Sequence, residues 1–273
     1  MTGPATLTEA ACAVLRTPGA RAKAELSRAV ADDWRRGALE TVGRAAPPDR
    51  PARPARPELL PPARMPKRRS AGSEATRVAL LHALAHIELN AVDLAWDLIA
   101  RFASDELPRA FYDQWVAVAA EEGLHFLLID DRLAALGAAY GDLPAHDELW
   151  EAATETAHDL TARLAIVPLV LEARGLDVTP AMIRRFDEAG DTATADILRI
   201  VLRDEIGHVA VGKHWFDWLC VRAGNDSRDM WRNLVKTHFR GLLKPPFNLE
   251  ARQKAGFPPD FYEGLSNGAK VGS

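Results

Sequence analysis

The central stretch of the chain, residues 74–223, repeats apolar side chains at helical spacing and shows almost no alternation of the strand type. Apolar residues that recur every three to four positions line one face of a helix, whereas a half-buried strand alternates with period two. Four long helices are predicted, over 74–102, from 106 to about 137, over 147–174 and over 191–223. Helices of this size are about 40 to 45 Å long. The pattern therefore predicts an all-α protein built around a four-helix bundle.

Prolines and glycines set the expected ends of these helices. Pro108 is suited to the first turn of the second helix, and Gly175 is suited to closing the third. Pro168 should kink the last turns of the third helix, because proline lacks the N–H group that a regular helix uses. A short additional helix is expected to open at Thr179 and Pro180.

Segments of different composition flank the predicted bundle. Residues 5–40 have helical periodicity with a break at 17–19, and residues 47–66 are so rich in proline that they should be extended. A basic tail interrupted by prolines begins at about residue 226. We therefore expect three parts: an arm of helix and proline-rich chain over 1–69, the bundle over 70–225, and a C-terminal helix with an extended tail over 226–273.

Charge is unevenly distributed, since the arm is rich in arginine and the remainder of the chain is acidic. Residues 44–69 could bind RNA, or the arm could pack on the acidic body. Packing is favoured, because no aromatic residues alternate with the arginines as in single-strand binders. The oligomeric state is left open.

A cytoplasmic protein is expected. No run of 18 uninterrupted apolar residues suggests a membrane span, and the first 20 residues lack the basic and apolar regions of a secretory signal. The two cysteines, Cys12 and Cys220, are far apart and match neither a disulfide framework nor a thiolate zinc site.

Four acidic residues interrupt the apolar faces of the predicted helices. Each lies among apolar neighbours three, four and seven positions away, on the face that its helix should bury; these residues are Glu88, Glu122, Glu172 and Glu205. Burying an unpaired carboxylate costs several kcal/mol, so four of them facing one core require compensating positive charge.

Histidine follows two of these acids at a fixed distance, in Glu122-x-x-His125 and Glu205-x-x-His208. Residues i and i+3 project from the same helix face, so each pair can bind one ion. One lone glutamate on each of two helices and Glu-x-x-His on each of the other two form the ligand set of di-metal carboxylate bundles. The six residues are therefore predicted to bind two metal ions, with a metal-free polar core as the alternative.

An acid precedes each of the two ligand glutamates, Glu121 before Glu122 and Asp204 before Glu205. A carboxylate that accepts the outer N–H of a metal-bound histidine fixes the orientation of the ring. We expect Asp204 to accept this hydrogen bond from His125 and Glu121 to accept it from His208. The alternative is that both acids are solvated charges on the helix surface.

A third copy of the motif, Glu155-x-x-His158, has polar neighbours on its face and is interpreted as a surface feature. Two glycines adjoin the predicted ligands, Gly123 and Gly207. They could shape a channel for oxygen or substrate, or they could allow close packing of helices.

Several stretches resemble an uncharacterised bacterial ferritin-like family, a domain of unknown function. The stretches that carry the resemblance are LLHALAHIELNAVDLAWDLIARF (80–102), AAEEGLHFLLIDDRL (119–133), PLVLEARGLDVTP (168–180), LRDEIGHVAVGKHWF (202–216) and KPPFNLEARQKAGF (244–257). The family is similar, at superfamily level, to the iron-dependent tRNA hydroxylase that acts on methylthio-isopentenyl-adenosine. The resemblance implies a ferritin-like fold in which the six predicted ligands match the superfamily's metal ligands. It implies no substrate.

The favoured function is an O₂-dependent oxidoreductase, a hydroxylase or oxygenase with two iron ions, an electron donor and a substrate that the sequence does not identify. Manganese, or one manganese and one iron, is the alternative metal content. The alternative functions are ferroxidase or iron handling, disproportionation of peroxide by two manganese ions, and hydroxylation of RNA.

Overall fold

A computed structural model describes residues 4–65, 73–239 and 241–265. Over these residues the protein is all-α and has no sheet, since the β-type pairing is one isolated bridge between Leu59 and Ala145. The chain forms two compact units, Met1–Trp150 and Glu151–Ser273, called unit 1 and unit 2 below. The all-α class predicted from the periodicity is confirmed. The three-part division stays a prediction, because compactness does not show which parts fold on their own.

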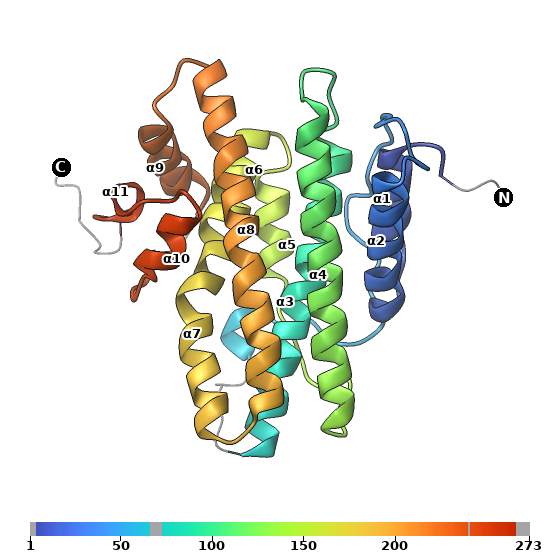
Figure 1. Cartoon of the computed structure of the whole chain (residues 1–273), viewed down its shortest axis with the longest axis vertical. Helices are drawn as coiled ribbons and strands as arrows, with labels where there is room; N and C mark the ends of the chain where they lie inside the picture. Colours follow the sequence, from blue (N-terminus) through green and yellow to red (C-terminus); the bar gives the residue numbers. More distant parts are fainter. Residues whose placement is uncertain (1–3, 66–72, 240, 266–273) are drawn as a thin grey trace. The chain divides into compact units, whose positions relative to one another are not determined.

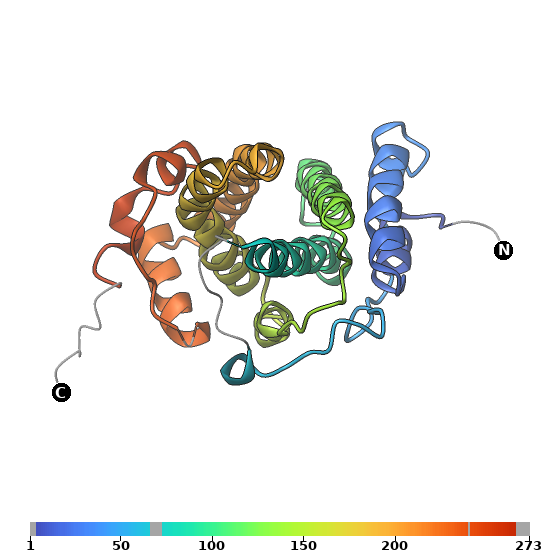
Figure 2. The ribbon, with the colours of Figure 1, turned by 90° about the horizontal axis from the view of Figure 1, so that it is seen from below.

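Unit 1 is built on two long helices that lie side by side (Figure 1). Helix α2 packs on α4 and α1 packs on α3, so the N-terminal helices cover the pair (Figure 2). The elements are α1 (Leu7–Leu15), α2 (Ala20–Arg35), a 3-10 turn (Pro62–Arg64), α3 (Glu74–Arg101) and α4 (Arg109–Ala135).

Local chemistry explains where these helices begin and end. Thr6 and Ser73 each cap a helix by accepting a hydrogen bond from the backbone N–H three residues on. Pro108 is the cap of α4 and not a residue of its first turn, so α4 begins slightly later than predicted. Gly137 follows the end of α4 with a φ of 71°, a left-handed conformation that glycine adopts without steric cost.

Basic residues of the arm form ion pairs with acids of unit 1. Arg21 contacts Asp130 and Asp131 at 2.7 and 2.5 Å. Further along the arm, Arg44 pairs with Asp105, and Arg50 pairs with Asp147. The arm therefore packs against this part of the acidic chain. Residues 66–69 of the predicted basic segment lie outside the described residues.

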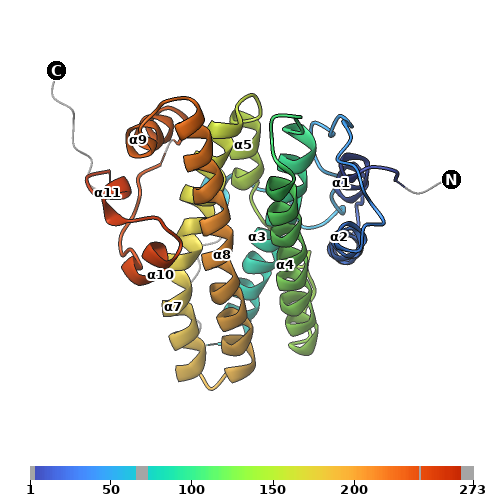
Figure 3. The ribbon, with the colours of Figure 1, turned by 45° about the horizontal axis from the view of Figure 1, so that its top comes forward.

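Unit 2 contains a second pair of helices that lie side by side, α7 and α8, joined by a short turn (Figure 3). Helix α9 packs on α6 and α8, and α10 packs on α7 and α8. The elements are α5 (Glu148–Glu155, which begins at the end of unit 1), α6 (Leu160–Ile166), a π-helix (Val167–Glu172), α7 (Ala173–Glu188), α8 (Thr192–Arg222), α9 (Ser227–His238), α10 (Leu249–Lys254) and α11 (Pro259–Tyr262).

The predicted single helix over 147–174 is wrong in two respects. It is interrupted after Glu155, because Asp159 caps a new helix by accepting a hydrogen bond from the N–H of Thr161. It also does not end at Gly175, because α7 continues through Gly175 and Pro180 as far as Glu188. Helix packing has here overridden two residues that commonly end helices.

The irregularity expected at Pro168 is present as the π-helix of six residues, Val167–Glu172. Proline has no N–H group and its ring crowds the preceding turn, so a wider turn accommodates it. The ring also packs against α8, where a Cβ added at Gly212 would lie 2.4 Å from the Pro168 Cβ. The lack of a side chain at Gly212 is what allows this approach.

Among the described residues, α3 is the one helix that is long and apolar enough to cross a membrane by length and composition. Most of its residues are buried, and the buried ones include Glu88, Asp93 and Asp97. A core helix commonly passes the same test of composition. The expected absence of a membrane span stays a prediction.

Candidate metal centre

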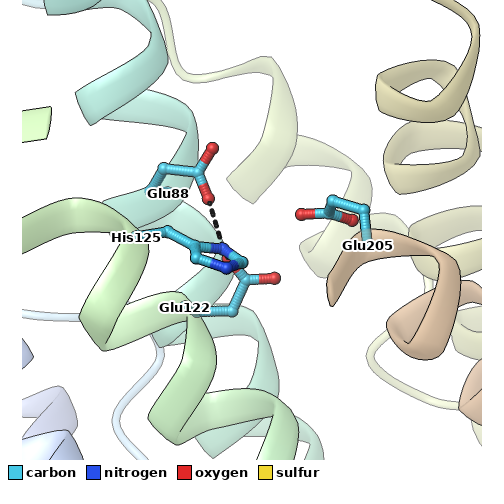
Figure 4. Close-up of side chains that lie close together, drawn as sticks. All are labelled: Glu88, Glu122, His125 and Glu205. Carbon is cyan, nitrogen blue, oxygen red and sulfur yellow. Dashed lines mark ion pairs between the residues drawn. The ribbon is translucent and has the colours of Figure 1, made fainter. Parts of the chain in front are cut away.

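Two glutamates and a histidine form a buried cluster between α3 and α4. Glu122 and His125 are fully buried, and Glu88 is 4% exposed. His125 Nδ1 lies 3.4 Å from Glu88 Oε2 and 3.6 Å from Glu122 Oε2. Figure 4 shows the ring of His125 facing the carboxylate of Glu88, with Glu122 one turn away on the same helix. These three residues are called the α3–α4 cluster below.

Simple helix geometry places two of the three residues together, and helix packing brings in the third. Glu122 and His125 lie at i and i+3, so both project toward α3, and Glu88 meets them from the middle of that helix. Gly123 lies on another face, because a Cβ added there would be 2.8 Å from the carbonyl oxygen of Ala24 on α2. Close helix packing, and not a channel beside the candidate site, therefore accounts for Gly123.

Helix α8 of unit 2 carries the second Glu-x-x-His motif. Glu205 and His208 are both buried, and His208 Nδ1 lies 3.7 Å from Glu205 Oε1. These two residues are called the α8 pair. Glu172 ends the π-helix of the same unit and is half-buried. A Cβ added at Gly207 would meet no atom within 4 Å, so this glycine has open space beside it.

One ligand atom from each residue of the α3–α4 cluster lies within 4.8 Å of the others. These three buried side chains could hold a metal ion. Glu172, Glu205 and His208 of unit 2 were predicted as ligands too. Their role as ligands stays a prediction.

The α3–α4 cluster suits a divalent cation. Metal–ligand bonds of about 2.1 Å place neighbouring ligand atoms about 3.0 to 3.4 Å apart. The separations of 3.4 and 3.6 Å around His125 Nδ1 are only slightly wider. Carboxylates and an imidazole in a buried site are typical ligands of iron, manganese and zinc.

The two outer acids have different surroundings. Asp204 forms an ion pair with its neighbour Arg203, at 2.8 Å between Arg203 Nε and Asp204 Oδ1, and is partly buried. Glu121 is also partly exposed. The predicted hydrogen bonds from these acids to the ligand histidines stay predictions.

A family model described as "Protein of unknown function (DUF455)" matches residues 16–263 of this chain. The chain belongs to the DUF455 family. An uncharacterised protein from Haemophilus influenzae (strain ATCC 51907 / DSM 11121 / KW20 / Rd) is 44% identical over 209 residues, which cover 75% of this chain and 72% of the relative. No solved structure matches the chain.

The match to the DUF455 model contains both Glu-x-x-His motifs, the lone glutamates and most of the arm. The family that the sequence resembles is thus confirmed as one of unknown function, while its ferritin-like relation is not shown by these comparisons. This DUF455 protein has a buried group of carboxylates and a histidine that could bind metal.

A buried charge cluster in this DUF455 protein was missed by the sequence analysis. Asp93 of α3 is fully buried and contacts Lys23 Nζ at 2.6 Å and Arg53 at 2.8 Å. Burial lowers the pKa of Lys23 and raises the pKa of Asp93, which disfavours both charges. An acid in the apolar run of α3 was a visible signal, but its partners lie 70 and 40 residues away in the arm.

Proposed function

We propose that this chain is a di-metal carboxylate oxidoreductase with a ferritin-like four-helix bundle, which uses two iron ions to oxidise a substrate with O₂. The observation that carries the proposal is the α3–α4 cluster, in which two buried carboxylates face one buried imidazole from neighbouring helices. The α8 pair supplies a matching motif. The proposed ligands are Glu88, Glu122, His125, Glu172, Glu205 and His208.

The burial of these acids favours their binding a cation. Removing a carboxylate from water costs several kcal/mol unless positive charge or hydrogen bonds compensate it. A neutral histidine between two carboxylates supplies one N–H at most to that side of the ring. A divalent ion bound by Nδ1 and by both acids would balance the charge of Glu88 and Glu122 fully.

The ligand types favour iron. Four carboxylates and two imidazoles form a hard ligand set without thiolate, which suits iron or manganese better than copper. A pair of iron ions would supply the reaction of O₂ with a substrate C–H bond: one oxygen atom enters the product, and the other leaves as water with two electrons and two protons from a donor. The chain would hold the ions and keep the site dry.

We infer that the basic arm packs on unit 1 and does not bind RNA. Three arginines of the arm already face acids of unit 1, namely Arg44, Arg50 and Arg53. A guanidinium that is paired with a carboxylate attracts phosphate less than a free one does. RNA hydroxylation is therefore not the favoured activity.

Elemental analysis and reaction with O₂ test the proposal. Protein loaded with ferrous iron without air should hold about two iron ions per chain. Admission of O₂ should then be followed by a new visible absorption band and by uptake of about one O₂ per pair of ions. Folded protein that stays metal-free after loading would refute the di-metal site.

Two other results would refute the oxygenase and leave the metal site intact. Oxidation and retention of many iron ions per chain would identify an iron-handling protein. Isolation with manganese, together with rapid breakdown of hydrogen peroxide, would identify a peroxide-disproportionating enzyme.

A further inference from the structure

The third Glu-x-x-His motif has a partner that is distant in the sequence. Glu155 and His158 adjoin the break between α5 and α6, and His238 is the last residue of α9. The rings of His158 and His238 have centroids 5.9 Å apart, and His238 Nδ1 lies 3.9 Å from Glu155 Oε1. All three residues belong to unit 2, and α6 packs against α9. They are called the α9 cluster.

His238 is the best-placed member of this cluster to bind an ion. Its side chain is 13% exposed, and within the described part of the chain its Nδ1 is buried and has no hydrogen-bond partner. The 3.9 Å to Glu155 is too long for a hydrogen bond. A buried ring nitrogen facing a carboxylate across this distance leaves a polar contact that a bound cation would complete.

The surrounding backbone favours positive charge. Glu155 is the last residue of α5 and His238 is the last residue of α9, so two helix C-termini adjoin the cluster. Backbone carbonyl groups at a helix C-terminus carry partial negative charge and stabilise cations nearby. Glu155 adds a full negative charge and is half exposed, so an ion in solution can reach it.

The distance between His238 and Glu155 is close to that of a metal site. Ligands bound to a tetrahedral zinc ion at about 2.1 Å lie about 3.4 Å apart. The separation of His238 Nδ1 and Glu155 Oε1 is 3.9 Å, so a small rotation of the exposed Glu155 would suffice. His158 is also exposed, and its ring, whose centroid lies 5.9 Å from that of His238, would have to rotate to reach the same ion.

We propose that Glu155, His158 and His238 bind one zinc ion, at a site separate from the α3–α4 cluster. Two imidazoles and one carboxylate suit zinc, whereas magnesium and calcium prefer oxygen ligands throughout. The ion would link the end of α9 to the segment between α5 and α6, and would stabilise the attachment of the C-terminal helix. This site does not depend on the proposed oxidoreductase function.

Titration of the full-length, iron-loaded protein with zinc chloride tests the site. Calorimetry should find one zinc ion per chain whose affinity falls at least tenfold in His158→Ala and in His238→Ala. The matched control is His214→Ala, which removes an exposed histidine of α8 outside the cluster and should leave zinc affinity unchanged. Zinc should also raise the melting temperature of the wild type and of His214→Ala, but not that of His158→Ala.

The visible absorption of bound cobalt tests directly which residues bind the ion. Cobalt chloride added to the iron-loaded protein should give an additional visible absorption band that is absent in iron-loaded His158→Ala. The band should survive in Glu122→Ala, which lacks a ligand of the α3–α4 cluster. His158 is exposed, so its alanine variant should fold even if His238→Ala does not. Equal zinc affinity in His158→Ala and the wild type, or loss of the added zinc in Glu122→Ala alone, would overturn the proposal.

Discussion

His125 Nδ1 and Glu88 Oε2 lie 3.4 Å apart in the core of unit 1, although 37 residues separate them in the sequence. Neither helix could bury its acid alone at low free-energy cost. The contact therefore links the packing of α3 on α4 to the assembly of the candidate site. A metal ion bound there would stabilise the helix pair by binding only the folded state.

Loss of a ligand should remove metal selectively. Glu122→Ala is expected to lose most of the bound iron, because the substitution removes a carboxylate that faces His125 at 3.6 Å. Glu155→Ala should keep its iron, since that residue belongs to the exposed α9 cluster. Elemental analysis of both purified variants checks this prediction. Equal loss of iron from the two would mean that the site was assigned to the wrong motif.

The buried pair of Lys23 and Asp93 should be important for stability. Asp93→Ala leaves Lys23 and Arg53 beside an empty position in the core, and should lower the free energy of unfolding by about 3–5 kcal/mol. Urea denaturation followed by circular dichroism measures the change.

An exposed ion pair provides the control for Asp93→Ala. Asp32 pairs with Arg35 on the surface of α2, where both side chains are more than half exposed. Asp32→Ala should cost less than about 1 kcal/mol, because solvent screens the pair. If the two variants lost similar amounts of unfolding free energy, burial of the Lys23 contact would add nothing to the stability of the protein.

Pro168 packs so closely on α8 that there should be no room for a side chain in place of Gly212. A Cβ there would lie 2.4 Å from the Pro168 Cβ, and the rigid ring cannot rotate away. Gly212→Ala should therefore destabilise the protein by about 1–3 kcal/mol, as overpacked cores do. Thermal unfolding of the metal-free protein measures the loss.

Gly207→Ala is the matched control on the same helix. A Cβ at Gly207 would meet no atom within 4 Å, so the substitution should be neutral or should stabilise α8 by up to about 1 kcal/mol. If Gly212→Ala were as stable as Gly207→Ala, the close packing of the π-helix on α8 would be disproved.

Both thiols should be unreactive in the folded protein. Cys12 and Cys220 are buried, and burial raises the pKa of both, that of Cys220 to about 11. At pH 8 a thiol with this pKa is ionised to the extent of about 10⁻³, and its reaction rate should rise about tenfold per pH unit toward pH 11. Titration with a disulfide reagent should label neither cysteine at pH 8 and both in urea. Fast labelling without denaturant would contradict the burial.

The sequence by itself determined the helical class, the long helices α3, α4 and α8, and the acids on their buried faces. These features follow from local spacing: apolar residues three and four apart define one helix face, and Glu122 and His125 share that face wherever the helix packs. The kink expected at Pro168 also follows from a local property, the missing N–H of proline.

Only the tertiary structure decided which distant residues meet. It joined Glu88 to His125, Lys23 to Asp93, and His238 to Glu155, because each contact depends on how helices pack and not on spacing along the chain. It also extended α7 through Gly175 and Pro180, where contacts with α8 outweigh a weak local preference to end the helix. Spacing along one helix is local information, whereas contacts between helices exist only after the chain has folded.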